Sequence, residues 1–383
     1  MGQSQSLKIK DLIPELRKIV GDDYVLDDQA DLLVYEYDGS IDRGNPVVVV
    51  LPDTAKKISQ VLKLARSNSI PVVARGAGTG LSGGAIAEHG GIVLSMARMN
   101  QILEVNRSDR YAIVEPGVVN LDLSTHVASE GLYYAPDPSS QRACTIGGNI
   151  AENSGGPHCL AYGVTTNHVL GMEVELADGT ITWFGENERD GIGYDLRGIT
   201  IGSEGTLAIV TKISVRLLRL PEHVKTMLMS FETIEDASAA VTGIIGAGMV
   251  PAALEMMDHF CIKAAEGAVG AGYPEGAGAV LLVELDGLLE SVEEESEEIE
   301  AIIINSDADK QRISLGLKQI SEDPFQLYLS NNPKNTIVKG VIQEIDERNA
   351  LIKLNEQVKG LLNVSEVSRD KVEDLRTVFK IND

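Results

Sequence analysis

The sequence contains few cysteines, no clustered histidines and a deficit of positive charge. Its three cysteines form no Cys-x-x-Cys pair, which argues against a disulfide framework and against a zinc ribbon. The six histidines are scattered without the spacing of metal ligands, so we expect no metal site. The formal net charge of -24 falls almost entirely on residues 1–302. Such an acidic body disfavours binding to nucleic acid or to an anionic membrane.

Long apolar segments are also missing. The longest uncharged stretch, residues 237–254, is interrupted by a threonine, three glycines and a proline, so it is unsuited to span a bilayer. The first residues lack the basic and apolar regions of a signal peptide. Gly2 and Ser6 match a myristoylation signal, but matches this short are commonly accidental. The 43% hydrophobic and 23% charged residues in a chain of 383 are typical of a globular protein of two or three domains. We expect a cytoplasmic protein without a membrane span.

The most informative segment is a glycine-rich loop at residues 72–84, which reads Val-Val-Ala-Arg-Gly-Ala-Gly-Thr-Gly-Leu-Ser-Gly-Gly. The apolar run at 70–74 is typical of a buried strand. Glycines let a ligand approach the main chain more closely than any Cβ would allow, and consecutive N–H groups suit a diphosphate. The loop has neither the Gly-x-Gly-x-x-Gly pattern nor the Gly-Lys-Ser/Thr of a nucleotide triphosphatase. Taken alone, it could also be only a tight turn.

Two further segments of small residues support the ligand-binding interpretation. They are residues 144–156, Cys-Thr-Ile-Gly-Gly-Asn-Ile-Ala-Glu-Asn-Ser-Gly-Gly, and residues 202–210, Gly-Ser-Glu-Gly-Thr-Leu-Ala-Ile-Val. Three such segments favour a long, partly flat ligand laid along the main chain. Together they resemble the FAD-binding domain of the vanillyl-alcohol-oxidase superfamily (PCMH type), and most of all the family of the FAD-linked D subunit of glycolate oxidase and D-lactate dehydrogenase. The resemblance covers about residues 10–300, and further matching segments are 45–52, 136–140, 168–174 and 178–179.

The resemblance implies a non-covalently bound FAD. Its diphosphate would lie on residues 75–82, its ribityl chain and ring along 136–137 and 144–154, and its adenosine end at 205–210. The expected cofactor-binding residues are Arg75, Gly76, Ala77, Gly78, Thr79, Gly80, Leu81, Ser82, Pro136, Asp137, Cys144, Thr145, Gly147, Gly148, Asn149, Ala151, Asn153, Ser154, Gly205, Ile209 and Val210.

The resemblance also implies a reaction. A small D-2-hydroxy acid, glycolate or D-lactate, would pass a hydride to flavin N5, and other oxidase subunits could carry the electrons onward. The relatives continue well beyond the point, near residue 303, at which the resemblance stops. The expected base and carboxylate clamp belong to that further part, so we name no catalytic residue and expect turnover to be impaired.

Two reactive side chains near the second small-residue segment have alternative interpretations. Cys144 could be a nucleophile, but no base is evident beside it in the sequence, so a small residue lining the cofactor is favoured. His158 could approach the flavin, but a lone histidine without a visible partner is more often structural.

We expect an α+β fold of four parts. These are an N-terminal helical segment (1–45), a PCMH-type FAD-binding domain of two subdomains (46–220), a truncated ferredoxin-like cap (221–302) and a partial OB-fold barrel (303–383). Periodicity predicts helices at 7–20, 234–245, 260–268 and 288–302, a helix with the core stripe Ile58, Val61, Leu62 and Ala65, and strands at 46–52, 70–74, 91–95, 102–105, 111–115, 172–177, 180–184, 226–231, 252–257 and 279–285.

The C-terminal region resembles incomplete OB-fold repeats of the large RNA-binding protein of the small ribosomal subunit, in segments 311–325 and 338–374. A hairpin at 300–318 and three strands within 336–366 could close one circularly permuted barrel. The strands that would face RNA carry Ile352, Leu354, Leu362 and Asn363 in place of aromatic residues, so we expect weak binding. An RNA-binding protein linked to translation and a chimera of two fragments without a joint function stay open as alternatives.

Overall fold

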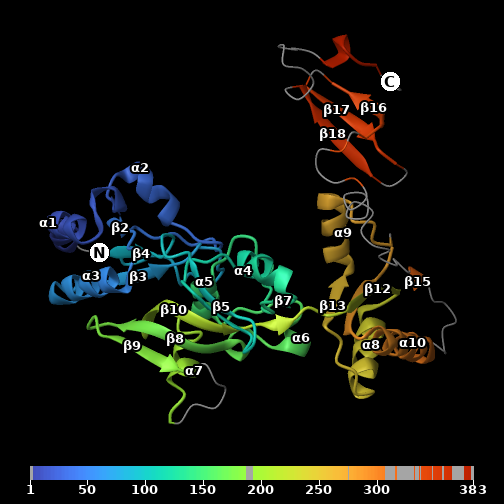
Figure 1. The fold of residues 1–383 in the computed structure, drawn as a ribbon, viewed down its shortest axis with the longest axis horizontal. Coiled ribbons are helices and arrows are strands. Elements are labelled where there is room, and N and C mark those ends of the chain that lie inside the picture. Colours follow the sequence, from blue (N-terminus) through green and yellow to red (C-terminus); the bar gives the residue numbers. More distant parts are fainter. Residues whose placement is uncertain are drawn as a thin grey trace. The chain divides into compact units, whose positions relative to one another are not determined.

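The computed structural model divides into two compact units, residues 1–316 and 317–383 (Figure 1). It describes residues 3–186, 193–274, 276–306, 315–316, 332, 336, 338–346, 348–355, 358–364 and 375–380. The chain is a mixture of helices and strands, as the sequence predicts. No helix in these ranges combines the length and apolarity needed to cross a bilayer.

The first subdomain is a four-stranded sheet with the strand order β1-β2-β4-β3, in which β2, β4 and β3 run parallel. Helix α3 begins after Thr54, whose side chain accepts a hydrogen bond from Lys57 N. Its predicted stripe is confirmed, because all four residues are buried in the core between helix and sheet. The elements are α1 (Gln3–Val20), β1 (Val25–Leu26), α2 (Gln29–Leu32), β2 (Val48–Val50), α3 (Ala55–Ser67), β3 (Val72–Arg75) and β4 (Ile92–Ser95).

The second subdomain is a five-stranded antiparallel sheet with the order β5-β6-β10-β8-β9. The hairpin predicted around Asp178-Gly179 is confirmed, since β8 and β9 pair across it. Gly179 takes a φ of +77° there, a conformation that favours glycine. The elements are β5 (Ile102–Asn106), β6 (Tyr111–Val114), α4 (Asn120–Val127), β7 (Leu132–Tyr133), α5 (Ile146–Glu152), α6 (Cys159–Tyr162), β8 (Val169–Leu176), β9 (Ile181–Gly185), α7 (Leu196–Thr200), β10 (Ala208–Arg216) and β11 (Leu218–Arg219).

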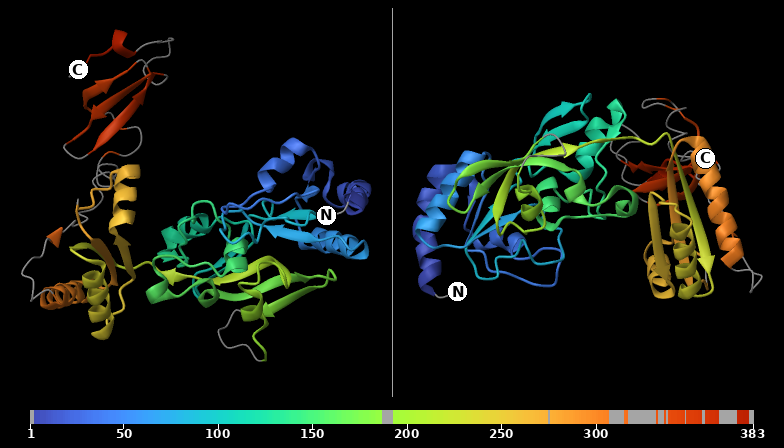
Figure 2. Two further views of the ribbon diagram at one scale, coloured as in Figure 1. Left: turned by 180° about the vertical axis from the view of Figure 1, so that it is seen from behind. Right: turned by 90° about the horizontal axis from the view of Figure 1, so that it is seen from below.

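The cap region, as we call residues 221–316, forms an antiparallel sheet with the order β13-β14-β12-β15 (Figure 2). Helices α8 and α10 pack on one face through Ile244, Ile299 and their neighbours, and α9 packs on the other through Ile262. Strand β15 belongs to this sheet, so the sheet continues beyond residue 302. The elements are β12 (His223–Phe231), α8 (Ile234–Gly246), β13 (Ala253–Asp258), α9 (His259–Val269), β14 (Ala279–Gly287), α10 (Leu289–Ser306) and β15 (Leu315–Gly316).

The second unit contains a three-stranded antiparallel sheet of β16 (Val341–Ile345), β17 (Asn349–Lys353) and β18 (Lys359–Asn363). These are the three strands expected within 336–366. The permuted barrel is wrong: residues 300–306 belong to α10, and β15 pairs with β12 of the cap region. Ile303 is buried in the core of the cap region, so helix α10 continues through the segment that was predicted to begin the hairpin. The remainder of the expected hairpin, 307–314 and 317–318, lies outside the described residues.

Candidate cofactor-binding site

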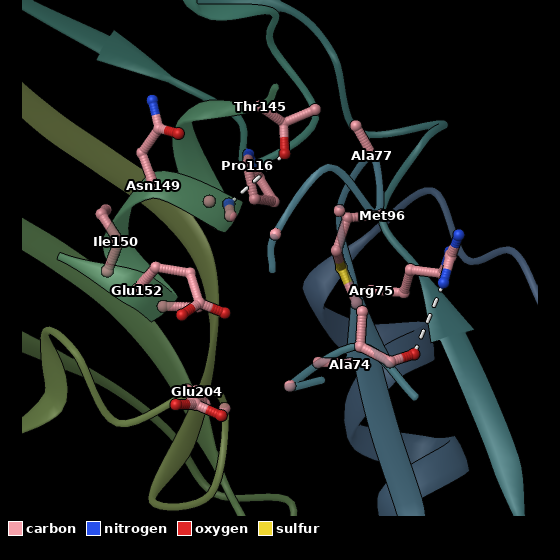
Figure 3. Close-up of a pocket in the computed structure, with 18 of the residues that line it drawn as sticks. Ala74, Arg75, Ala77, Met96, Pro116, Thr145, Asn149, Ile150, Glu152 and Glu204 are labelled. Atoms are coloured by element: carbon pink, nitrogen blue, oxygen red, sulfur yellow. Dashed lines mark hydrogen bonds between the residues drawn. The ribbon is translucent and has the colours of Figure 1, made fainter. Parts of the chain in front are cut away.

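A pocket lies where the three glycine-rich segments meet (Figure 3). The first segment leaves the C-terminal end of β3, the second leads into α5, and the third leads into β10. The pocket therefore joins both subdomains. The predicted residues that line it are Arg75, Gly76, Ala77, Gly78, Thr79, Gly80, Cys144, Thr145, Gly147, Gly148, Asn149, Ala151, Ser154, Gly205, Ile209 and Val210.

Glycine is required where the loops approach each other. A Cβ on Gly76 would lie 2.5 Å from Thr145 Oγ1, and one on Gly147 would lie 2.5 Å from Pro116 Cβ. Gly78 has a φ of +71°, and its Cβ would overlap the Arg75 guanidinium. The pocket walls at these positions are therefore formed by closely packed main chain, and side chains larger than glycine would fill the space between the loops.

The start of α5 is organised by its own side chains. Thr145 caps the helix by accepting a hydrogen bond from Gly148 N at 3.3 Å. Asn149, only 2% exposed, donates to Asn120 Oδ1 at 2.8 Å. Asn120 in turn donates to Pro136 O at 2.8 Å. These contacts fix the second segment against the chain that precedes it.

Charge in the pocket is mostly negative. Among the described lining residues Arg75 is the only arginine or lysine, whereas Asp38, Glu152 and Glu204 are acidic. Figure 3 shows the two glutamates on the wall opposite Arg75. Burial and then the neighbouring Glu204 charge raise the pKa of Glu152. An anionic diphosphate in this pocket would therefore depend on backbone N–H donors.

Arg75 itself is turned toward the protein. It is 7% exposed, lies 5.5 Å from the Tyr35 ring centre, and donates to Val34 O at 3.4 Å and to Ala85 O at 3.5 Å. Burial lowers the pKa of its guanidinium. These contacts fix Arg75, and with it the start of the glycine-rich loop, against neighbouring segments of the chain.

Five predicted residues do not line the pocket: Leu81, Ser82, Pro136, Asp137 and Asn153. Leu81 is 77% exposed. Asn153 Oδ1 accepts a hydrogen bond from Thr166 N at 2.9 Å. Contact of these five with FAD stays a prediction.

The expected set of cofactor-binding residues omitted other lining residues. Seven of them lie inside the three glycine-rich segments, and the six outside, Asp38, Ala85, Met96, Pro116, Ser140 and Thr200, carry no glycine signal. Asp38 comes from the segment before β2, which an Asp-Gly turn at 38–39 could have indicated. The missed residues are Asp38, Ala74, Gly84, Ala85, Met96, Pro116, Ser140, Ile150, Glu152, Thr200, Ser203, Glu204 and Ala208.

Cys144 fits the expected lining role. Its side chain is 3% exposed, and burial raises the pKa of its thiol. A nucleophilic cysteine needs the thiolate form, so the geometry disfavours that alternative. Among the described residues no group of three His, Cys, Asp or Glu side chains is arranged to hold a metal ion.

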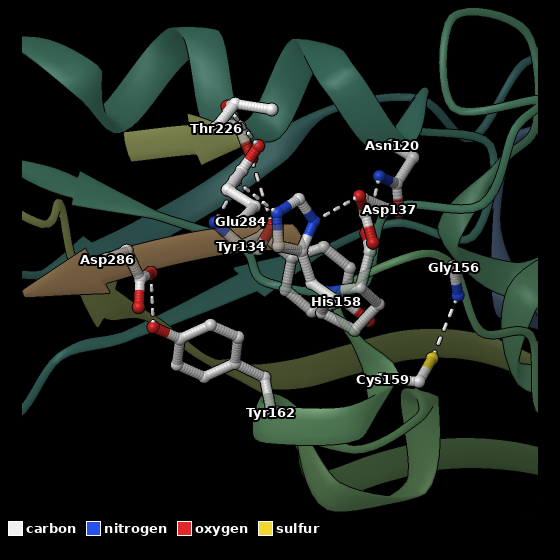
Figure 4. Close-up of polar contacts among 12 residues, drawn as sticks. Asn120, Tyr134, Asp137, Gly156, His158, Cys159, Tyr162, Thr226, Glu284 and Asp286 are labelled. Atoms are coloured by element: carbon white, nitrogen blue, oxygen red, sulfur yellow. Dashed lines mark hydrogen bonds and ion pairs between the residues drawn. The ribbon is translucent and has the colours of Figure 1, made fainter. Parts of the chain in front are cut away.

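His158, which shows no partner in the sequence, has two carboxylate partners (Figure 4). Its Nδ1 lies 2.6 Å from Asp137 Oδ2, and its Nε2 lies 2.8 Å from Glu284 Oε1 in strand β14. Hydrogen bonds to both carboxylates raise the pKa of His158 to about 10. It is therefore an imidazolium at neutral pH, which makes it unsuitable as a general base.

Three family models match the chain. An FAD binding domain matches residues 46–185, the C-terminal domain of FAD linked oxidases matches 220–321, and an S1 RNA binding domain matches 332–383. The first match includes two of the three glycine-rich segments.

Curated relatives share the same region. Glycolate oxidase subunit GlcD of Escherichia coli K12 is 45% identical over 291 residues, which are 76% of this chain and 58% of that protein. GlcD of Bacillus subtilis is 43% identical over 320 residues, 83% of this chain and 67% of that protein. D-lactate dehydrogenase of Anaerostipes hadrus is 34% identical over 76% of this chain and 62% of that protein. The chain thus spans about three-fifths of the length of these relatives.

Solved structures share the fold. Alkyldihydroxyacetonephosphate synthase superposes with a TM-score of 0.67 at 20% identity, over 78% of this chain and 59% of that chain. p-Cresol methylhydroxylase superposes with a TM-score of 0.64 at 20% identity, over 85% and 69%. The FAD-binding fold is therefore of the PCMH type. From the identity to the Bacillus relative over two-thirds of its length, this chain belongs to the FAD-linked oxidase family of glycolate oxidase subunit GlcD and D-lactate dehydrogenase.

Proposed function

We propose that this protein is an FAD-dependent oxidoreductase that oxidises a small D-2-hydroxy acid of the glycolate or D-lactate class. The observation that carries the proposal is the pocket built from three glycine-rich segments. The names of the relatives, glycolate oxidase and D-lactate dehydrogenase, give the substrate class. We keep the four expected domains, 1–45, 46–220, 221–302 and 303–383, as part of the proposal, with the end of α10 and strand β15 counted with the third because they belong to the cap region.

Bound FAD would accept the hydride that the hydroxy acid gives up. The chain's own part is to bind and orient it: the main chain of residues 76–80 would donate to the diphosphate, and Thr145, which caps α5, would fix the turn beside it. Asp38, Glu152 and Glu204 line the pocket, but the base and the carboxylate clamp are expected in the part of the relatives beyond the resemblance, so we assign no catalytic residue. The word subunit in the relatives' names favours partner proteins that carry electrons onward. A cytoplasmic location stays a prediction.

The visible absorbance spectrum of the purified protein tests cofactor binding. The wild-type chain should carry a flavin spectrum. Gly76→Ala should lose most of it, because the added Cβ would lie 2.5 Å from Thr145 Oγ1. Gly267→Ala, a control in helix α9 with open space around it, should keep it. A wild-type protein that takes up no FAD would refute the proposal.

A second candidate function is RNA binding by the C-terminal unit, which the match to the S1 RNA binding domain favours. Its β17 and β18 carry Ile352, Leu362 and Asn363 where stacking aromatics would strengthen binding. We therefore expect weak affinity that falls with salt. A gel-shift titration of the full chain with single-stranded RNA tests this, and absence of a shift at low salt refutes it. A chimera without a joint function stays the alternative.

A further inference from the structure

A group of charged side chains lies outside the pocket, at the junction of the FAD-binding domain with the cap region (Figure 4). We call Asp137, His158, Tyr162, Glu284 and Asp286 the junction cluster. His158 bridges Asp137 and Glu284, and the Tyr162 hydroxyl donates to Asp286. Glu284 Oε2 also accepts from Thr226 Oγ1 at 3.3 Å. The cluster connects two loops of one domain to strand β14 of the other.

Two of its members lie next to the pocket in the sequence. Asp137 precedes the lining residue Ser140 by three positions, and His158 follows the lining residue Ser154 by four. The two loops are tightly packed, because a Cβ on Gly156 would overlap Asp137. A displacement of either loop would therefore be transmitted to the pocket wall.

Buried hydrogen bonds make the same connection. From the lining residue Asn149 they lead to Asn120 and on to Pro136 O, both at 2.8 Å. Asp137 is the next residue. The two asparagines are 2% and 1% exposed, so neither can easily exchange its partner for water.

The balance of charge in the junction cluster depends on His158, which lies between two carboxylates. The side chains of Asp137, His158 and Glu284 are 18%, 30% and 24% exposed. Without the imidazolium, two partly buried carboxylates would face each other, with Asp286 nearby. Removing one partner of such a group leaves uncompensated charge and is strongly destabilising.

We propose that His158 is a positioning residue of the cofactor site: by holding β14 against the two loops that continue from the pocket, it couples FAD binding to the packing of β14 on those loops. The proposal rests on the proposed binding of FAD. Coupling of this kind is reciprocal. An intact cluster should tighten FAD binding, and bound FAD should stabilise the cluster.

Two measurements on the full chain test this. Fluorescence titration gives the FAD dissociation constant, and hydrogen exchange with mass spectrometry gives the protection of the β14 amides with and without FAD. In the wild type, FAD should slow exchange in β14. In His158→Ala, FAD should bind at least tenfold more weakly and should no longer protect β14. His89→Ala, at an exposed histidine, should behave as wild type.

A second-site variant separates positioning from general damage. Glu284→Gln in the His158→Ala background removes one of the facing carboxylates, so it should restore part of the FAD affinity. Glu284→Gln alone keeps the oxygen that accepts from His158 and should weaken FAD binding only a few-fold. Wild-type affinity in His158→Ala, or unchanged protection of β14 by FAD in that variant, would refute this inference but not the proposed function. A wild-type chain that binds no FAD would refute the proposed function as well.

Discussion

Glu175, in strand β8 of the five-stranded sheet, is a fully buried carboxyl group. Within the described part of the chain neither of its oxygens has a hydrogen-bond partner. Burial, and then the charge of Glu173, raise the pKa of Glu175 from the ordinary 4.5 to about 8. The folded protein therefore holds a proton at neutral pH that the unfolded chain releases.

The sign of the effect on stability follows from proton binding. Between pH 4.5 and 8 the folded state binds more protons at this site than the unfolded state, so the free energy of unfolding falls as the pH rises. Each unit contributes about 1.4 kcal/mol. At pH 7 the accumulated loss is roughly 3 kcal/mol, a large fraction of the stability of an ordinary domain.

Glu175→Gln removes this titration. We expect the variant to have nearly wild-type stability near pH 5 and to be more stable by about 2–3 kcal/mol at pH 7. Urea unfolding of the cofactor-free chain measures this, followed by fluorescence of Trp183, the only tryptophan in the sequence. Trp183 lies on β9 opposite Glu173, so it reports on the same sheet.

Glu173→Gln is a comparison variant. Both Glu173 oxygens lie 3.1 Å from Lys212 Nζ, so this change removes an ion pair and should lower the stability at pH 5. Because the Glu173 charge also helps to raise the pKa of Glu175, the loss of stability between pH 5 and 7 should become smaller in this variant but should not vanish as it does in Glu175→Gln. If Glu175→Gln keeps the wild-type loss of stability between pH 5 and 7, Glu175 is ionised in the folded state and the reasoning is wrong.

Three further outcomes are expected. Gly78→Val should abolish flavin absorbance, because its Cβ would overlap the Arg75 guanidinium; normal occupancy would place the diphosphate elsewhere. Acid precipitation should release all flavin into the supernatant, and colour left in the pellet would reveal a covalent bond. Dithionite should reduce the bound flavin readily and D-lactate or glycolate only slowly, because a general base alone is worth about a hundred- to ten-thousand-fold in rate. Rapid bleaching by either acid without a partner protein would show that a base and clamp are present.

Local patterns predicted most elements of the fold. The stripe on α3 and the hairpin at Asp178-Gly179 depend on spacing within a few residues, and the sequence contains that spacing directly. The glycine loops were predictable for a related reason, since a main-chain site needs small residues in sequence.

Long-range pairings were not predictable in the same way. Glu284 lies 126 residues from His158, and no local sequence pattern indicates a partner so distant. Asp38 reaches the pocket only because the segment before β2 folds over the first glycine loop, with Gly39 N donating to Gly80 O at 2.8 Å. The prediction of a permuted barrel was wrong because it paired two segments that resemble fragments of the same kind of repeat, whereas β15 pairs with strand β12 of the cap region.

The acidic lining of the pocket has a consequence for the kinetics of cofactor loading. A dianionic ligand that approaches Asp38, Glu152 and Glu204, on a chain of net charge -24, meets an unfavourable field before it reaches any N–H donor. Salt screens such a field over about 10 Å at 0.1 M. Association should therefore become faster as ionic strength rises, the reverse of electrostatic steering. A newly made chain at low salt would therefore acquire its cofactor slowly.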